Sequence, residues 1–235
     1  VVGGLQIQFL SGTSTFNCTL GFNAVRAGVR GYVTNSHCTA TQGGVQNTVH
    51  HQAVRAVAAD RIGVEIRDPL YFTGGVCPAG RRCRYSDTSF GQYDSSVASS
   101  QGHIARPSLG SVAWNGTSLF RIVGETSFPV SGALLTKVGR TTGRTQGNVT
   151  ATCFNVNVTG TNITQLCQDR ASYASAGGDS GSPVFRITNS PATNDVSLYG
   201  IHWGSGGVFS AIGSFNIQRA AEMGPLTTCA AGFAC

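Results

Sequence analysis

Short stretches in which apolar and polar residues alternate recur along the whole 235-residue chain. Residues 5–10, Leu-Gln-Ile-Gln-Phe-Leu, alternate with a period of two, as in a strand with one buried face. Similar stretches bounded by turn residues lie at 18–25, 29–36, 62–66, 118–123, 133–138, 183–187, 197–204 and 207–212. One stretch, 215–223, has helical spacing, and Gly224-Pro225 ends it. The pattern predicts an all-β protein with a short C-terminal helix.

The composition agrees with this pattern. The chain has 32 Gly and only 11% charged residues, which favours short strands and many turns. Its length suffices for one large β domain or two small ones. No stretch resembles a signal peptide or a membrane span. Because the chain starts at Val1-Val2-Gly3-Gly4 without Met, we expect a mature form whose export signal and pro-segment have been cleaved.

Eight cysteines without a C-x-x-C pair indicate disulfides rather than zinc ligation, and hence a secreted, extracellular protein. Two cysteine pairs enclose short loops, and a third joins two arms of a hairpin around Gly160. Eight cysteines leave the connectivity open, but the spacing favours Cys77–Cys83, Cys153–Cys167 and Cys229–Cys235.

The net charge is +6, and the densest basic run is Arg81-Arg82-Cys83-Arg84. Such a run can bind nucleic acid or acidic glycans, but more often it is a solvated loop. Without interleaved aromatic residues or a nucleic-acid motif, we expect no nucleic-acid partner. His50 and His51 point to opposite faces of a strand, so we interpret them as surface residues and expect no metal or other cofactor. We further expect a monomer without a membrane partner.

The candidate chemistry centres on Ala176-Gly-Gly-Asp-Ser-Gly-Ser-Pro-Val184. A serine is a poor nucleophile unless a base takes its proton and hydrogen-bond donors receive the developing negative charge. The glycines allow a sharp turn, so the N–H groups of Gly178 and Ser180 are candidates for an oxyanion hole. By itself the motif is also compatible with an ordinary turn.

His37 supplies a candidate base at the end of a predicted strand, directly before Cys38. The segments Cys18-Thr-Leu-Gly-Phe-Asn-Ala-Val25 and Gly31-Tyr-Val-Thr-Asn-Ser-His-Cys38 resemble the chymotrypsin-type serine peptidases, above all the bacterial streptogrisins and α-lytic proteases. Residues 138–150, Val-Gly-Arg-Thr-Thr-Gly-Arg-Thr-Gln-Gly-Asn-Val-Thr, resemble the same branch. Asn35-Ser36 departs from that family's Ala-Gly.

The resemblance implies two six-stranded antiparallel Greek-key β-barrels. The first, residues 1–105, carries the catalytic His and Asp, and the second, residues 106–235, carries the nucleophilic Ser and the specificity pocket. The resemblance also implies a Cys18–Cys38 bridge, His37 as general base and Ser180 as nucleophile. These residues imply an endopeptidase that hydrolyses polypeptides through an acyl-enzyme, made as a zymogen.

Two residues fit the family's pattern for the triad carboxylate, Asp87 and Asp94. We favour Asp87, because Tyr93 follows it by six residues as in streptogrisin-like sequences. The order His, Asp, Ser is that of chymotrypsin-type enzymes. Asp179 either pairs with the chain's N-terminus, as in animal members, or has internal partners, as in the bacterial branch, which we favour.

The preference for the substrate residue before the cleaved bond (P1) depends on the residues of the specificity pocket. Ala174 stands six residues before Ser180, where trypsin-like enzymes need a carboxylate. Gly200-Ile-His-Trp-Gly204 resembles a segment of glutamyl endopeptidases whose His helps hold the substrate carboxylate. With further donors such a site holds a desolvated carboxylate, so we assign substrate binding to Ser175, His202, Trp203, Gly204 and Ser205.

Other readings remain open. His202 can also be a structural residue that bonds to the backbone, and a preference for apolar or small P1 residues would follow. An esterase would use the same chemistry. A catalytically inactive relative that only binds is a further alternative, although all three triad positions are filled.

Overall fold

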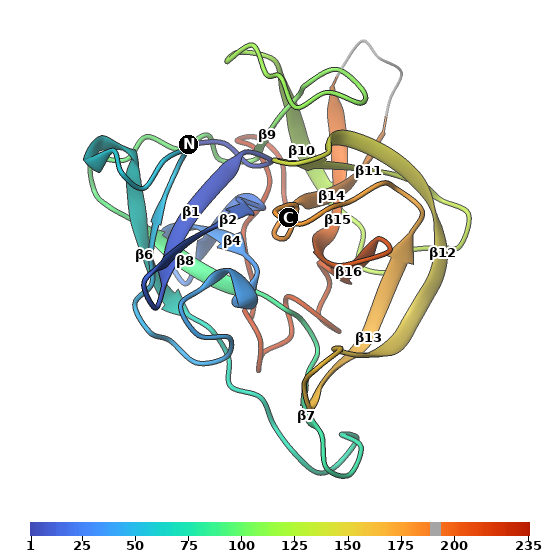
Figure 1. Cartoon of the computed structure of the whole chain (residues 1–235). Helices are drawn as coiled ribbons and strands as arrows, with labels where there is room; N and C mark the ends of the chain where they lie inside the picture. The colour runs from blue at the N-terminus through green and yellow to red at the C-terminus, as the bar shows by residue number, and fades with distance from the viewer. Residues whose placement is uncertain (189–193) are drawn as a thin grey trace.

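The computed structural model describes residues 1–188 and 194–235 and consists almost entirely of β-strands in two sheets (Figure 1). The first sheet contains β1 (Gln6–Ser11), β2 (Ser14–Thr19), β3 (Phe22–Arg26), β4 (Val29–Thr34), β5 (Val49–His51), β6 (Arg61–Arg67) and β8 (Ser89–Tyr93). The second contains β7 (Arg82–Arg84), β9 (His103–Ala105), β10 (Leu119–Glu125), β11 (Leu134–Gly139), β12 (Gly143–Asn157), β13 (Ile163–Ala171), β14 (Pro183–Ile187), β15 (Asp195–Gly204) and β16 (Val208–Ala211). The helices of the described residues are two 3₁₀ turns, η1 (Ser36–Cys38) and η2 (Ala58–Asp60).

The first sheet is antiparallel throughout, in the order β2-β1-β5-β6-β8-β4-β3. On β1, Ile7 and Phe9 are buried while Gln6 and Gln8 are half-buried, as the alternation predicts. Ile7 and Phe9 pack with Leu20 and Tyr32, so one face of the sheet has a core of its own.

The second sheet closes on itself. Its strands follow the order β14-β11-β12-β13-β16-β15, and β14 also pairs with β15, which completes a ring of six strands. β10 joins β15, and β7 joins β13, in parallel pairs. Residues of both sheets also share one core: Phe22, Val33 and Phe90 from the first sheet, and Val138, Phe185, Leu198 and Ile201 from the second. The two sheets therefore form one packed unit.

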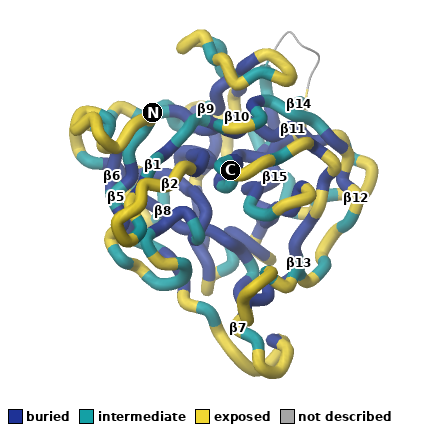
Figure 2. Tube along the Cα trace, viewed as in Figure 1, coloured by how far each residue is buried: buried dark blue, intermediate teal, exposed yellow. Residues whose placement is uncertain are grey.

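All four disulfides join the cysteines as predicted: Cys18–Cys38, Cys77–Cys83, Cys153–Cys167 and Cys229–Cys235. The strands of both sheets are mostly buried, whereas the loop before β7, which includes Cys77, is largely exposed (Figure 2). Within the described ranges, no helix has the length and apolar character needed to cross a membrane.

The second sheet has the predicted six-strand ring, to which β7, β9 and β10 add, whereas the first sheet has seven strands. Two predictions of secondary structure or environment are wrong. Residues 215–223 form successive turns rather than a helix, since the Asn216 and Glu222 side chains bond to distant backbone and side-chain groups. His50 is fully buried, bonded to Tyr32 Oη (2.9 Å) and to the Cys38 carbonyl (2.9 Å).

Candidate active site

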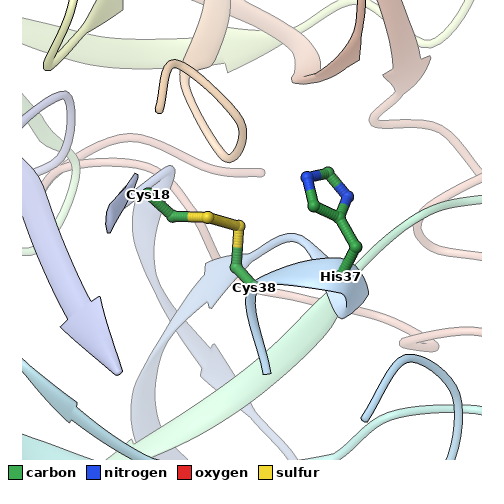
Figure 3. Close-up of side chains that lie close together, drawn as sticks. All are labelled: Cys18, His37 and Cys38. Atoms are coloured by element: carbon green, nitrogen blue, oxygen red, sulfur yellow. A yellow bond between two sulfur atoms is a disulfide. The ribbon is translucent and has the colours of Figure 1, made fainter. Parts of the chain in front are cut away.

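His37 lies in η1, directly after β4, where the chain leaves the first sheet. The side-chain amide of Asn35 donates to the Asp87 carbonyl at 2.7 Å, and the Ser36 N–H donates to the same carbonyl at 3.3 Å. These bonds join the end of β4 to the segment that carries Asp87. The Cys18–Cys38 disulfide fixes the other side of the turn (Figure 3). Local backbone pairing thus brings His37 and Asp87 together.

Asp87 is buried and directed at His37. Its Oδ2 accepts a hydrogen bond from His37 Nδ1, and its Oδ1 accepts from the His37 N–H (3.3 Å) and from Gln42 Nε2 (3.2 Å). Burial raises the pKa of Asp87, but the neighbouring His37 and Arg84 outweigh burial and lower that pKa below its usual value. For His37, burial lowers the pKa, whereas the Asp87 charge and hydrogen bond raise it by more. The pair therefore stabilises an imidazolium.

Asp94, the other candidate carboxylate, lies elsewhere. It accepts hydrogen bonds from Arg61 Nε at 2.7 Å and Nη2 at 3.3 Å, in a partly exposed ion pair. The structure thus brings Asp87, and not Asp94, to His37.

A buried ionic network lies next to the segment that carries Asp87. Arg84 donates to Asp68 Oδ1 (2.6 Å) and to Glu222 Oε2 (3.0 Å), and all three side chains are almost completely buried. Asp68 Oδ2 accepts from Ser36 Oγ at 2.8 Å, next to His37. The Arg81–Arg84 run is therefore not simply a solvated loop, because its last residue lies in the interior.

Ser180 lies in a turn between β13 and β14 that contacts the His37 segment. Its carbonyl accepts a hydrogen bond from the Thr19 N–H at 2.7 Å and lies 3.9 Å from Cys38 Sγ. Gly181 has φ +92°, and a Cβ there would lie 2.0 Å from the Thr19 carbonyl oxygen. Glycine is therefore required for this close approach. No hydrogen bond between Ser180 Oγ and His37 occurs in the part of the chain that the structure describes.

Two peptide N–H groups of this turn, those of Gly178 and Ser180, point opposite to carbonyl groups that are hydrogen-bonded within the protein. The Gly177 carbonyl accepts from Thr141 Oγ1 at 2.7 Å, and the Asp179 carbonyl accepts from the Ser182 N–H at 2.9 Å. In a trans peptide the following N–H points opposite to the carbonyl. The N–H groups of Gly178 and Ser180 accordingly have no acceptor among the described residues, as a binding site for an oxyanion requires.

Asp179 has internal partners, in agreement with the bacterial arrangement. Its carboxylate accepts from Lys137 Nζ (2.9 Å), Thr142 Oγ1 (2.7 Å) and the Thr141 N–H (2.9 Å), and both charged groups are fully buried. Burial raises its pKa, but Lys137 and the hydrogen bonds lower it by more. The N-terminal amine of Val1 instead donates to the Ala98 carbonyl at 2.7 Å.

The residues predicted to contact P1 divide into two groups. His202 is buried on β15, and its Nδ1 shares a 3.3 Å hydrogen bond with Tyr173 Oη. Burial, with the nearby Lys137 charge, lowers the pKa of His202 to about 3, so its ring is neutral at pH 7. Ser175 is partly exposed in the loop before Ser180, whereas Ala174 is exposed and its carbonyl accepts from Thr145 Oγ1 at 2.8 Å.

Trp203, Gly204 and Ser205 form the second group and line a cavity of about 400 Å³. His37 and Asp87 lie on the same cavity, so it adjoins the candidate catalytic residues. The end of β12 and the following loop, residues 156–159, and Arg170 on β13 also line it. Ser175 and His202 do not line it.

Sequence reasoning missed several residues of this region. Gln42 bonds to Asp87, and Ser210 Oγ accepts from the Asp87 N–H at 3.3 Å. Gln168 Oε1 accepts from Ser210 Oγ (2.7 Å) and from Trp203 Nε1 (2.8 Å), which connects Asp87 to the cavity wall. These are isolated polar residues within loops or strands, and nothing in their local sequence distinguishes them.

The Cys18 and Cys38 sulfurs and a His37 nitrogen lie within 4.8 Å of one another (Figure 3). The two sulfurs are bonded to each other, whereas metals bind the thiolate form. We therefore assign no metal site to this group.

Solved structures similar to this chain are bacterial serine proteases. A glutamic acid-specific serine protease, described as using a histidine triad in substrate binding, is 25% identical over 90% of this chain and 94% of its own, with a TM-score of 0.61. Nocardiopsis protease is 23% identical over 89% of both chains, with a TM-score of 0.59. The α-lytic protease homologue N4 is 22% identical over 90% of this chain and 93% of its own, with a TM-score of 0.58.

No protein-family model and no curated protein matches the sequence. The structural comparisons nevertheless confirm the expected resemblance and the chymotrypsin-like fold.

Proposed function

We propose that the chain is a serine endopeptidase whose catalytic triad is Ser180, His37 and Asp87, and its similarity to bacterial chymotrypsin-like proteases supports this. The hydrogen bond between His37 Nδ1 and Asp87 Oδ2 carries this proposal, because it leaves Nε2 free to act as a base and holds the imidazole in one tautomer. The Ser180 turn beside this pair supplies the nucleophile.

The reaction is acyl transfer in two stages. His37 Nε2 takes the Ser180 hydroxyl proton as Oγ attacks the peptide carbonyl carbon, and the carbonyl oxygen becomes an oxyanion. The unpaired N–H groups of Gly178 and Ser180 support a role as donors to this oxyanion. The imidazolium then protonates the leaving amine, and a water molecule, deprotonated by His37, releases the acyl group and restores Ser180.

We further propose a preference for Glu at P1, read by His202. The similarity to a glutamic acid-specific protease supports this, as does the backbone pairing of His202 with Gly181 and Ser182 of the Ser180 turn, at 2.9 Å each. A bound carboxylate would favour the protonated imidazole and raise the pKa of His202 from its low value. The ring of His202 is bonded to Tyr173 and to the Val208 backbone, and among the described residues no second histidine is hydrogen-bonded to it. Selectivity for Glu would therefore depend on one histidine with neighbouring hydroxyls.

A preference for apolar or small P1 residues is the competing proposal. The burial of His202 supports this alternative. The side chain is only 3% exposed and is bonded to Tyr173, as expected for a histidine with a purely structural role. In that case a substrate carboxylate would not be accepted near His202, since an unpaired buried charge is costly.

The experiment is a cleavage profile on a mixed peptide library at neutral pH, with Ser180→Ala as the inactive control. Cleavage concentrated after Glu supports the His202 assignment, and His202→Gln should then reduce the Glu-over-Leu ratio of kcat/KM. Cleavage after apolar or small residues keeps the triad and removes the Glu preference. Absence of cleavage by the wild-type protein would contradict both proposals.

We also infer a secreted enzyme. All eight cysteines are paired in four disulfides, and none of the described cysteines is free. Disulfides persist in oxidising compartments and are rare in the reducing cytosol. Separation of the cell-free medium from washed cells, followed by detection of the mature chain in each fraction, tests this inference.

A further inference from the structure

The cavity beside His37 contains one cation that no carboxylate neutralises. Of its charged lining residues, Asp87 is buried and bonded to His37 and Gln42, so it offers no free charge to a ligand. Arg170 is exposed on the cavity wall, and no ion pair of the described residues includes it. Arg170 is therefore the charged group of this lining that remains available to a ligand.

Arg170 is held in position by its surroundings. On β13 it pairs in register with Val208 of β16 and Ala151 of β12, and its guanidinium carbon lies 4.8 Å from the centre of the Phe154 ring. A cation over an aromatic face is attracted to it without losing its charge. This contact restricts the side chain and leaves the guanidinium N–H groups available to an anion.

The neighbouring carboxylate does not serve as a partner. Asp169 precedes Arg170 on β13, and successive side chains of a strand point to opposite faces. Asp169 is buried, its Oδ1 accepts from the Cys153 N–H at 3.1 Å, and burial raises its pKa to about 6. It does not line the cavity that contains Arg170.

We propose that Arg170 and this cavity bind an acidic side chain of the substrate at P2, P3 or P4, the residues that precede P1. The proposal rests on the proposed peptidase function, and it adds a second determinant of specificity. Trp203, Gly204 and Ser205 continue directly from His202 along β15 and line the cavity. A peptide whose P1 side chain lies near His202, and which follows this edge, brings the adjoining residues past Arg170.

The remaining lining suits such a side chain. Val156, Val158, Trp203 and Val208 give the cavity apolar walls, which contact methylene groups and reduce the access of water to an ion pair. Asn157 and Thr159, both exposed, add polar groups to the lining. A volume of about 400 Å³ accommodates a Glu side chain with adjoining backbone. The guanidinium fork matches a carboxylate in geometry as well as in charge.

The test measures kcat/KM for peptides that differ by one carboxylate. P1 is fixed at the residue that the library identifies, and Glu is compared with its neutral isostere Gln at P2, P3 and P4 in turn. We expect Glu to be favoured by roughly 3- to 10-fold at one of these positions, the range of a partly screened ion pair, and by less in 1 M salt.

Variants then assign this preference to a residue. Arg170→Gln should reduce the Glu/Gln ratio to about one, and Arg170→Glu should reverse it so that Lys is favoured over Glu. Arg186→Gln is the matched control. Arg186 is exposed on β14, outside the cavity, and its substitution removes the same charge. It should leave the ratio at its wild-type value.

Two results would overturn the proposal: equal turnover of the Glu and Gln peptides by the wild type, or a ratio that Arg170→Gln and Arg186→Gln change alike. The second result would assign the effect to net charge. Neither depends on which P1 residue is preferred, so loss of the P1 Glu proposal leaves the test intact. If the wild type cleaves none of the peptides, the peptidase function itself fails.

Discussion

Arg84 Nη1 lies 2.6 Å from Asp68 Oδ1, and neither side chain is more than 1% exposed. Since Arg84 also bonds to Glu222, one buried cation joins β7, the loop after β6 and the C-terminal segment. The Asp87 segment follows Arg84 directly, so this network supports the part of the chain that contacts His37.

Arg84→Met should therefore lower the free energy of unfolding by about 3–5 kcal/mol, because it leaves two buried carboxylates without their cation. Urea unfolding of the variant and the wild type measures this change. The control is Arg61→Ala, which breaks the partly exposed pair with Asp94 and should cost less than about 1 kcal/mol. Equal losses of unfolding free energy in the two variants would show that the buried network stabilises the protein no more than an exposed ion pair does.

Lys137 and Asp179 form a second buried pair, next to the candidate nucleophile. Lys137→Met should destabilise the protein by about 3–5 kcal/mol and reduce kcat, since Asp179 would lose its charged partner and the Ser180 turn depends on Asp179. The double variant with Asp179→Asn should recover part of the lost stability, because it removes the unpaired charge. Additive losses in the double variant would contradict this coupling.

Gly181 permits the contact between the Ser180 turn and the first sheet. Gly181→Ala adds a Cβ 2.0 Å from the Thr19 carbonyl oxygen at a φ of +92°, so we expect a large loss of activity and a lower melting temperature. Gly124→Ala is the control, because nothing lies within 4 Å of its Cβ position and its φ is outside the left-handed region. Thermal unfolding and peptide turnover of both variants test the difference; similar behaviour would contradict the steric argument.

The contact between His37 and Asp87 determines how kcat/KM depends on pH. The pKa of His37 is raised above its usual 6.5, so the imidazolium persists to higher pH, and kcat/KM should fall on acidification through a pKa above 6.5. Asp87→Asn should shift this fall to lower pH and reduce the rate by about 10⁴-fold, whereas Asp94→Asn should leave both nearly unchanged. A crippling effect of Asp94→Asn would overturn the assignment.

Much of the fold could be predicted because its signals are local. The alternation in residues 5–10 depends on one buried face of β1, and Ile7 and Phe9 occupy that face. The cysteine pairs also depend on short separations or on a recognisable family pattern. Likewise, the Gly-rich turn around Ser180 has a sequence signature that reflects its backbone conformation.

The wrong predictions concern residues whose environment comes from distant parts of the chain. Residues 215–223 have helical spacing, but Glu222 bonds to Arg84, which is 138 residues away in sequence. His50 is buried because Tyr32 and the Cys38 carbonyl satisfy both of its ring nitrogens. The side chains of Gln168 and Ser210 connect Asp87 to Trp203 only after four segments have assembled. Spacing along the sequence does not contain these contacts.

The central claim, that Ser180 is a nucleophile activated by His37, is tested most directly by labelling. The protein is incubated with an alkyl fluorophosphonate, which phosphonylates activated serines with loss of fluoride, and the adduct is located by peptide mass spectrometry. We predict one adduct, on Ser180, that is lost in Ser180→Ala and strongly reduced in His37→Ala. An adduct on another serine, or none on a wild-type protein that cleaves peptides, would contradict the account.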